Sequence, residues 1–296
     1  MRIAVATDFS ERSREAFPVA RSLAEVFPGD MLLVHHAVLS TLTVPAAPAV
    51  DVVYRAAEER LADMVATDEA LRGAAVRPVL LRGGNARTFG ELLAENEVDL
   101  LVLASHGHTG VRRFLLGSFA EKALRFAPCP VLVHRRREHD TPQLTGFRPR
   151  RILIPHDLSP PSLRALETAC DWARRFDAAV RIVHVVSFEA GATGFGPDLL
   201  GTWHQYQQRM EEVAREEISK VVSERLEDVK AETIVIAGHP VLEILAQAEE
   251  FGADLIALGS HGRSGLEHLL LGSVAEKVIR KAHCPVLAIK RTAGAP

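Results

Sequence analysis

Two stretches of the chain decide the fold. Residues 254–290 read DLIALGSHGRSGLEHLLLGSVAEKVIRKAHCPVLAIK, and residues 99–135 read DLLVLASHGHTGVRRFLLGSFAEKALRFAPCPVLVHR. The two align without a gap at an offset of 155 residues and are identical at 20 of 37 positions. The chain therefore contains an internal duplication of a long segment.

The front parts of the two copies also align, at an offset of 149 residues, which pairs Asp8 with Asp157. The change of offset places about six extra residues in the second copy, between His184 and Gly238. We expect them in the glycine-containing stretch 187–201, because loops tolerate insertions better than helices or strands do.

Each copy is about 140 residues long, which is the size of a domain rather than of a solenoid repeat. We therefore expect a first domain at 1–135 and a second at 151–291. The segment 136–150 between them is charged and polar and lacks apolar periodicity, so it is predicted to be a linker.

The composition narrows the class of protein. The 296 residues are 47% hydrophobic and 25% charged, with a formal net charge of −3 and three cysteines. These values argue against a dedicated nucleic-acid binder, which needs a basic surface, and against a disulfide framework or a zinc ribbon. No apolar run is long enough to span a bilayer, and the N-terminus lacks the pattern of a signal peptide. We expect a cytoplasmic protein with no membrane or nucleic-acid partner.

Short aliphatic runs alternate with longer amphipathic segments, which predicts a parallel sheet with helices on both faces. Pro18 interrupts the first helical segment of the first copy and is expected to kink it. The strands expected in the first copy are 2–6, 31–37, 76–81, 99–105 and 130–135. Those expected in the second copy are 151–155, 179–186, 231–237, 253–259 and 285–290, separated by helices at 159–176, 203–226, 240–251 and 272–282.

In open α/β sheets, ligands bind beyond the carboxyl ends of the strands. Three segments of the second copy follow such ends and carry the candidate residues. They are Pro155-His156-Asp157 after the first strand, Gly259-Ser260-His261-Gly262-Arg263 after the fourth, and Gly272-Ser273-Val274 at the start of the last helix.

Each segment suits one part of a nucleotide. Gly259 has no side chain to obstruct a flat ring or a sugar, and Gly262 allows close approach of the backbone. The amides of Gly272 and the two residues after it would be free donors at a helix N-terminus, where the helix dipole favours an anion. The carboxylate of Asp157 suits ribose hydroxyls or an exocyclic amine.

Taken singly, each segment also has a purely structural interpretation. Gly272-Ser273 could be only a helix cap, Asp157 only a turn or capping acceptor, and Arg263 only a solvated loop charge. The known nucleotide motifs are missing: the sequence has no P-loop, no GxGxxG after the first strand and no GxSxG elbow. The combination of the three segments, present in both copies, favours ligand binding.

The pattern G-x2-G-x9-G-[ST], here Gly259, Gly262, Gly272 and Ser273, resembles the ATP-binding signature of the universal stress protein family. The flanks SHGRSG, LLLGSVAEKV and CPVLAIK, and PHDLS after the first strand, are also similar to that family. The resemblance covers nearly the whole chain as two tandem copies. It implies two Rossmann-like domains of the adenine-nucleotide α-hydrolase-like type, each a five-stranded parallel sheet in the order 3-2-1-4-5.

The resemblance also implies an adenine nucleotide as ligand. Asp157 would contact the adenosine, Val185 would flank the base, and Gly259 and Gly262 would line the ribose and phosphates. Gly272, Ser273 and Val274 would bind the phosphates. His261 is expected to orient its loop or touch a phosphate, and Arg263 to pair with one.

The first copy departs from the pattern, since Ala104 replaces the first glycine and His36 stands where the second copy has Val185. We expect the second copy to be the stronger site. The corresponding candidates in the first copy are Thr7, Asp8, His36, Ala104, His106, Gly107, Gly117, Ser118 and Phe119.

Dedicated metal or catalytic chemistry is weakly supported. No cysteine or carboxylate at ligand spacing accompanies the thirteen histidines, so a Mg²⁺ ion held through nucleotide phosphates fits better than structural zinc. Cys129, Cys170 and Cys284 are interpreted as small core residues. No catalytic base or arginine finger is identifiable, so at most slow ATP hydrolysis is expected.

The sequence thus predicts a stress-response regulatory protein that binds ATP or another adenine nucleotide. A nucleotide-independent scaffold of the same fold is the main alternative, and an adenine-nucleotide α-hydrolase enzyme is the third. In the family the last strands pair edge to edge, which implies an internal pseudo-dimer of the two copies, and a further homodimer is allowed.

Overall fold

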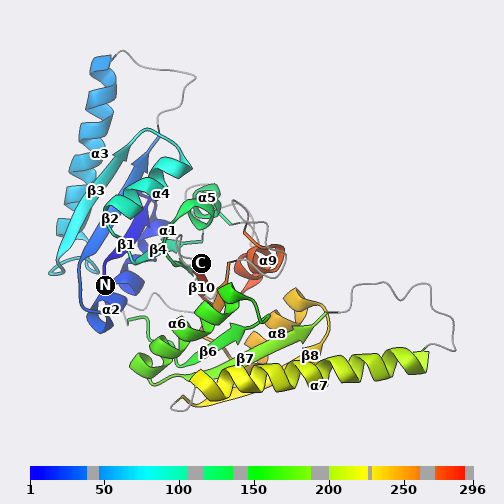
Figure 1. Cartoon of the computed structure of the whole chain (residues 1–296). Helices are drawn as coiled ribbons and strands as arrows, with labels where there is room; N and C mark the ends of the chain where they lie inside the picture. Colours follow the sequence, from blue (N-terminus) through cyan, green and yellow to red (C-terminus); the bar gives the residue numbers. More distant parts are fainter. Residues whose placement is uncertain are drawn as a thin grey trace. The chain divides into compact units, whose positions relative to one another are not determined.

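The computed structural model describes residues 1–38, 47–105, 116–135, 146–187, 200–225, 229–260 and 271–290. The chain divides into two compact units, Met1–Arg148 and Pro149–Arg291. Each unit alternates strands and helices, as the sequence predicts (Figure 1). The expected pairing of the units through their last strands stays a prediction.

The first unit contains five strands and five helices within its described residues. The strands are β1 (Ile3–Thr7), β2 (Met31–Ala37), β3 (Val76–Arg82), β4 (Leu100–Ala104) and β5 (Val131–His134). The helices are α1 (Glu11–Arg14), α2 (Phe17–Val26), α3 (Ala47–Thr67), α4 (Ala86–Glu95) and α5 (Ser118–Phe126).

The second unit has the same alternation with one helix fewer among its described residues. The strands are β6 (Arg151–Pro155), β7 (Ala179–Val186), β8 (Ala231–Ala237), β9 (Leu255–Gly259) and β10 (Val286–Ile289). The helices are α6 (Pro160–Phe176), α7 (Leu200–Arg225), α8 (Pro240–Phe251) and α9 (Ser273–Lys281).

Both units have a parallel sheet in the predicted 3-2-1-4-5 order. The orders are β3-β2-β1-β4-β5 and β8-β7-β6-β9-β10. The registers also repeat: Ile3 pairs with Met31 and Leu100, and its counterpart Ile152 pairs with Val180 and Leu255. The sheet registers therefore reproduce the two sequence offsets of 149 and 155 residues.

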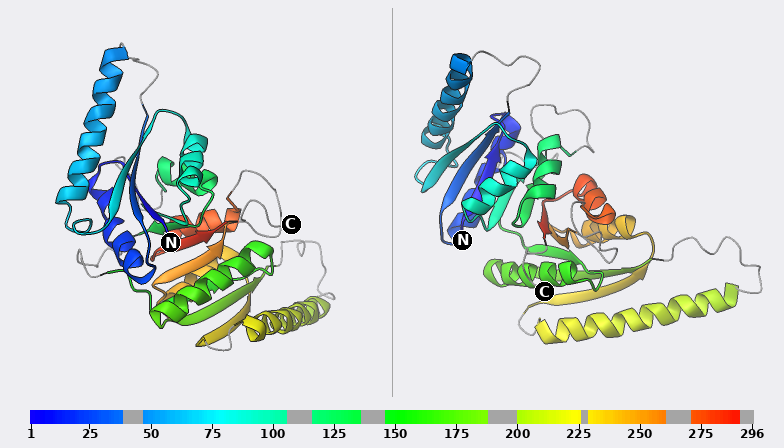
Figure 2. Two further views of the ribbon diagram at one scale, coloured as in Figure 1. Left: turned by 60° about the vertical axis from the view of Figure 1, so that its left-hand side comes forward. Right: turned by 45° about the horizontal axis from the view of Figure 1, so that its top comes forward.

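The strand order runs in one direction from β1 to β3 and then in the other from β1 to β4 and β5. Because strand–helix–strand connections are right-handed, this reversal places helices on both faces of each sheet. In the second unit α8 packs against α9, whereas α6 packs on β6, β9 and β10. Figure 2 shows α6 lying across one face of this sheet, while α7 runs along the edge strand β8. Among the described helices of both units, none is long and apolar enough to cross a membrane.

The sheets are buried on both sides and mainly aliphatic. The side chains of Ile152, Leu153 and Ile154 in β6 are fully buried, as is each counterpart in β1. Cys129, Cys170 and Cys284 are buried, which confirms their interpretation as small core residues. Helix α7 has 26 residues where α3 has 21, so the extra residues of the second copy are not confined to a loop.

Pro18 has a larger effect than the expected kink, because the first helical segment is broken in two. Helix α1 ends at Arg14 and α2 begins at Phe17, with Pro18 in its first turn. A proline at position 18 inside one continuous helix would lack its N–H and would clash with the carbonyl of Arg14. In α6 the prolines occupy the first turn behind the Ser159 N-cap, so that helix is continuous.

Gly259 is required by helix packing, which differs from the reason expected from the sequence. A Cβ atom at Gly259 would lie 2.8 Å from the carbonyl carbon of Pro161 and 2.9 Å from the backbone nitrogen of Ser162. The glycine therefore lets the first turn of α6 approach β9 closely. The first unit has Ala104 at this position, opposite the one-turn helix α1.

Gly259→Ala is expected to lower the free energy of unfolding by about 1–3 kcal/mol, the usual cost of overpacking. The sign of the change in unfolding free energy is informative. A Gly-to-Ala change without a clash stabilises a protein by about 0.4–1 kcal/mol, because it reduces the conformational entropy of the unfolded chain. Urea unfolding measures the difference. Ala104→Gly is the matched control, with an expected loss of about 0.5–1 kcal/mol from chain entropy alone. A Gly259→Ala protein as stable as the parent would contradict the packing role.

Candidate functional site

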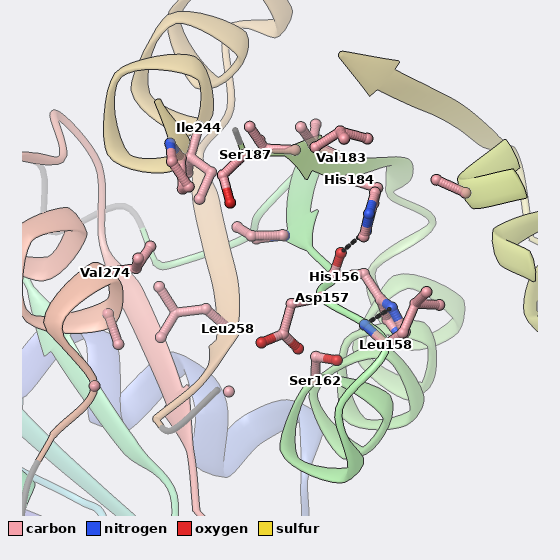
Figure 3. A pocket seen from close by; sticks show the side chains of 18 of the residues that line it. His156, Asp157, Leu158, Ser162, Val183, His184, Ser187, Ile244, Leu258 and Val274 are labelled. Atoms are coloured by element: carbon pink, nitrogen blue, oxygen red, sulfur yellow. Dashed lines mark hydrogen bonds between the residues drawn. The ribbon is translucent and has the colours of Figure 1, made fainter. Parts of the chain in front are cut away.

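A cavity of about 510 Å³ opens at the carboxyl ends of β6, β7 and β9 in the second unit (Figure 3). This volume lies within the range of small-molecule sites. Its lining comes from strand ends, from the turn after β6 and from the four helices α6, α7, α8 and α9. The lining residues are Pro155, His156, Asp157, Leu158, Ser162, Val183, His184, Val185, Val186, Ser187, Met210, Val213, Ala214, Glu217, Pro240, Ile244, Leu258, Gly259, Gly272, Ser273, Val274 and Ala275.

The turn between β6 and α6 sets the direction of Asp157. Leu158 has a φ angle of 64°, in the left-handed region that costs a non-glycine residue about 1–2 kcal/mol. Local hydrogen bonds hold this conformation: the Leu158 N–H donates to His156 Nδ1 at 3.1 Å, and the Ser159 N–H donates to Asp157 Oδ1 at 3.1 Å. The carboxylate of Asp157 is directed into the space bounded by Leu258 and Val274 (Figure 3).

The pKa of Asp157 lies below its usual value. Burial alone raises the pKa, because it disfavours the charged form. The hydroxyls of Ser159 and Ser162 and the Ser159 backbone N–H outweigh this effect, with a smaller contribution from His156. Asp157 is therefore a half-buried carboxylate that is ionised at neutral pH.

Two buried histidines support the same turn. His156 and His184 are 3% and 5% exposed, and His184 Nδ1 lies 2.7 Å from the carbonyl oxygen of His156. His156 Nδ1 accepts the Leu158 N–H, which ties the ring to the turn. Both rings line the cavity and also fix the backbone that bounds it.

One side of the cavity is apolar. Val183 and Val185 come from the end of β7, and Met210, Val213 and Ala214 come from α7. The three α7 residues recur at the i, i+3, i+4 spacing of one helix face.

The opposite side of the cavity is the N-terminus of α9. Gly272 is the N-cap residue, no side-chain hydrogen bond caps the helix, and Ser273, Val274 and Ala275 follow along the cavity wall. One expectation was wrong: the N–H of Gly272 is not free, because it donates to the carbonyl oxygen of Ser260 at 2.8 Å. The donors expected to face a ligand are therefore those of the helix's first turn.

The structure brings most of the sequence-predicted residues of the second copy to one cavity. Eight of them line it: Pro155, His156, Asp157, Val185, Gly259, Gly272, Ser273 and Val274. His261, Gly262 and Arg263 lie outside the described residues. Their roles in binding stay predictions.

Sequence reasoning missed the lining contributed by α7 and α8, and at the end of β7 it identified only Val185. Met210 and Val213 gave a signal in their helical spacing, but Ser187, Glu217 and Ile244 gave none, since nothing local relates them to the strand ends. Their place in the cavity follows from tertiary packing.

The first unit repeats the turn after its first strand. The Phe9 N–H donates to Thr7 Oγ1 at 3.0 Å and the Ser10 N–H donates to Asp8 Oδ1 at 3.0 Å, while Phe9 has a φ angle of 66°. Thr7 thus takes the place of His156 as the acceptor.

The remaining candidates of the first unit lie at the same edge of their sheet. Ala104 ends β4, Gly117 caps α5, and Ser118 and Phe119 begin that helix. His36 Nε2 lies 2.8 Å from the carbonyl oxygen of Gly83. His106 and Gly107 lie outside the described residues.

Within the described parts of the chain, no group of three or more His, Cys, Asp or Glu side chains is placed to hold a metal ion. A divalent cation at the cavity would therefore need ligands from a bound molecule, as Mg²⁺ commonly has from phosphates.

The strand order and the alternation of strands and helices define a doubly wound α/β domain, present twice in one chain. The chain belongs to the Universal stress protein family, whose family model matches residues 1–135 and 149–290. The tandem-domain form predicted from the sequence is thereby confirmed.

Individual relatives agree with this assignment. Universal stress protein MJ0531 of Methanocaldococcus jannaschii is 41% identical over 143 residues, which cover 48% of this chain and 82% of that protein. A universal stress protein of Mycolicibacterium smegmatis is 27% identical over 296 residues, covering 97% of this chain and 96% of that one. The crystal structure of a universal stress protein from Archaeoglobus fulgidus matches with a TM-score of 0.68 at 22% identity, over 98% of this chain and 96% of that one.

The lowered pKa of Asp157 predicts a pH dependence of stability. A carboxylate whose pKa is lower in the folded than in the unfolded protein stabilises the fold above its unfolded pKa of about 3.9. That stabilisation is lost as the pH falls from there through the folded pKa. Asp157→Asn, which keeps an acceptor but removes the charge, should be less stable than the parent at pH 6, and the gap should shrink toward pH 2.5. Urea unfolding at both pH values measures it, and an equal gap at both would contradict the assignment.

Proposed function

We propose that the second unit binds an adenine nucleotide and that the protein acts as a nucleotide-responsive regulator. The carrying observation is that an apolar wall, an ionised carboxylate and a helix N-terminus without a side-chain cap all face one cavity. The apolar wall suits a base, the carboxylate suits ribose hydroxyls, and the helix N-terminus suits a phosphate chain.

The base is proposed to lie between the end of β7 and helix α7. Val183 and Val185 on one side and Met210 and Val213 on the other supply apolar surface for a flat ring. Met210 and Val213 are each 37% exposed without a ligand, so a ring placed there would remove apolar area from water.

The ribose and phosphates are proposed to divide between Asp157 and α9. The Asp157 carboxylate can accept hydrogen bonds from ribose hydroxyls but repels phosphates, so it sets the direction of the ligand. The N-terminus of α9 attracts the phosphates through its free amides and its dipole, with the Ser273 hydroxyl as a further donor. Mg²⁺ would then be held by phosphate oxygens and water.

The first test is whether nucleotide is bound at all. Protein purified without added ligand is denatured, and the released material is examined by ultraviolet absorbance and mass. Isothermal titration calorimetry of the ligand-free protein with ADP and ATP follows. Absence of binding in both experiments would favour the scaffold alternative. Steady-state phosphate release, with Asp157→Ala for comparison, measures any hydrolysis.

Gly272→Val is expected to weaken ATP binding at least tenfold, because a branched side chain would stand at the cavity wall beside the phosphates. The φ and ψ angles of Gly272, −58° and 142°, suit valine, so the backbone need not move. Ser273→Ala should weaken binding about 2- to 10-fold, the loss of one hydrogen bond. Calorimetric titration with ATP measures both effects.

Leu242→Ala is the control for these variants. Leu242 is 60% exposed on α8 and does not line the cavity, so its truncation should leave the affinity for ATP unchanged. Melting temperatures verify that every variant is folded. If Gly272→Val and Ser273→Ala bind ATP as the parent does, the phosphates are not held at α9.

A further inference from the structure

The two units differ at three equivalent positions around the crevice. The sequence offsets pair Val185 with His36, Ile244 with Phe89 and Val274 with Phe119. In the second unit the three aliphatic side chains line the open cavity. In the first unit the same positions hold three rings.

These rings contact one another, and we name His36, Phe89 and Phe119 the ring cluster. His36 and Phe89 stack with centroids 6.1 Å apart and planes at 19°, and Phe89 meets Phe119 edge-on at 5.0 Å. Phe89 is only 1% exposed. The ring cluster thus joins β2, α4 and α5 where the second unit has its cavity wall.

The polar edge of the ring cluster is also engaged within the unit. His36 Nε2 lies 2.8 Å from the carbonyl oxygen of Gly83, just after β3. A ligand base entering here would have to break this contact and separate the stacked rings. An aromatic pair is worth about 0.5–1.5 kcal/mol beyond the area that it buries.

A second contact in the first unit links α3 to the turn after β1. The Arg60 guanidinium carbon lies 4.7 Å from the centroid of the Phe9 ring, and Arg60 Nη2 donates to the Phe9 carbonyl oxygen at 3.4 Å. Phe9 in turn lies 4.0 Å from the His35 ring. Burial, with smaller effects from His36 and Arg60, lowers the pKa of His35 against opposing effects of Thr7 and Asp8, so a neutral ring lies beside Arg60.

The corresponding positions of the second unit leave this space open. Leu158, the counterpart of Phe9, and the α7 residues Met210 and Val213 all line the 510 Å³ cavity. Helix α3 is therefore tied to the turn after the first strand, whereas α7 faces its turn across a cavity.

We propose that the first unit is a self-filled copy of the site, in which its own rings take the place of a base. The chain then binds one adenine nucleotide, in the second unit. Val185, Ile244 and Val274 are the specificity-determining residues, because their small aliphatic side chains keep that crevice open. This inference rests on the proposed nucleotide binding. It goes further by fixing the number of sites and the side chains that set it.

The number of sites is measured by calorimetry of the full chain with ADP and by native mass spectrometry. We expect one ADP per chain, with an affinity that Gly272→Val lowers at least tenfold. Two ADP per chain would overturn the self-filled first unit while leaving nucleotide binding intact. No ADP bound to the parent would overturn the proposed function itself.

The role of the rings is tested by moving one into the second unit. Ile244→Phe gives α8 the ring that Phe89 gives α4, and we expect the affinity for ADP to fall at least tenfold. Leu242→Phe is the matched control, with the same new side chain on the exposed side of the same helix and no expected change in affinity. Melting temperatures within a few degrees of the parent show that both variants are folded. An Ile244→Phe protein that binds ADP like the parent would overturn the inference.

Discussion

The turn after the first strand of each unit is the constraint on which the rest depends. Phe9 and Leu158 both adopt left-handed backbone, and in each case the acceptor two residues before holds their N–H. Asp8 and Asp157 accept a hydrogen bond from the N–H of the serine two residues later, which caps the following helix. This strained turn therefore ends a strand, begins a helix and directs a carboxylate along the sheet edge.

The two units share this backbone and differ in the size of the side chains at the edge of the sheet. Parallel strands end at one edge of the sheet, so both units present the same frame for a ligand. Val185, Ile244 and Val274 leave a cavity in that frame, whereas His36, Phe89 and Phe119 contact one another. The duplication thus repeats the fold, while packing leaves a cavity in the second copy and brings three rings into contact in the first.

Much of the fold could be predicted because its signals are local. The predicted ranges of β7, β8 and α8 match those observed, since buried aliphatic runs and the Gly-x-Pro turn mark them. The residues predicted for the site gather because strand ends converge. The close packing of Gly259 against the backbone of α6 was not predicted, and the N–H of Gly272, which was expected to be free, donates to the carbonyl oxygen of Ser260. Both contacts are made to residues elsewhere in the sequence, those of Gly259 to Pro161 and Ser162 and that of Gly272 to Ser260.

The sequence by itself determined the duplication, the family, the parallel order of strands and the segments at the crevice. These are properties of periodicity, spacing and local turn chemistry. Only the tertiary structure decided which side chains from α7 and α8 complete the cavity, and that Phe89 of α4 lies between His36 and Phe119. The physical reason is that a cavity is the space left after distant elements pack, and no single segment specifies that space.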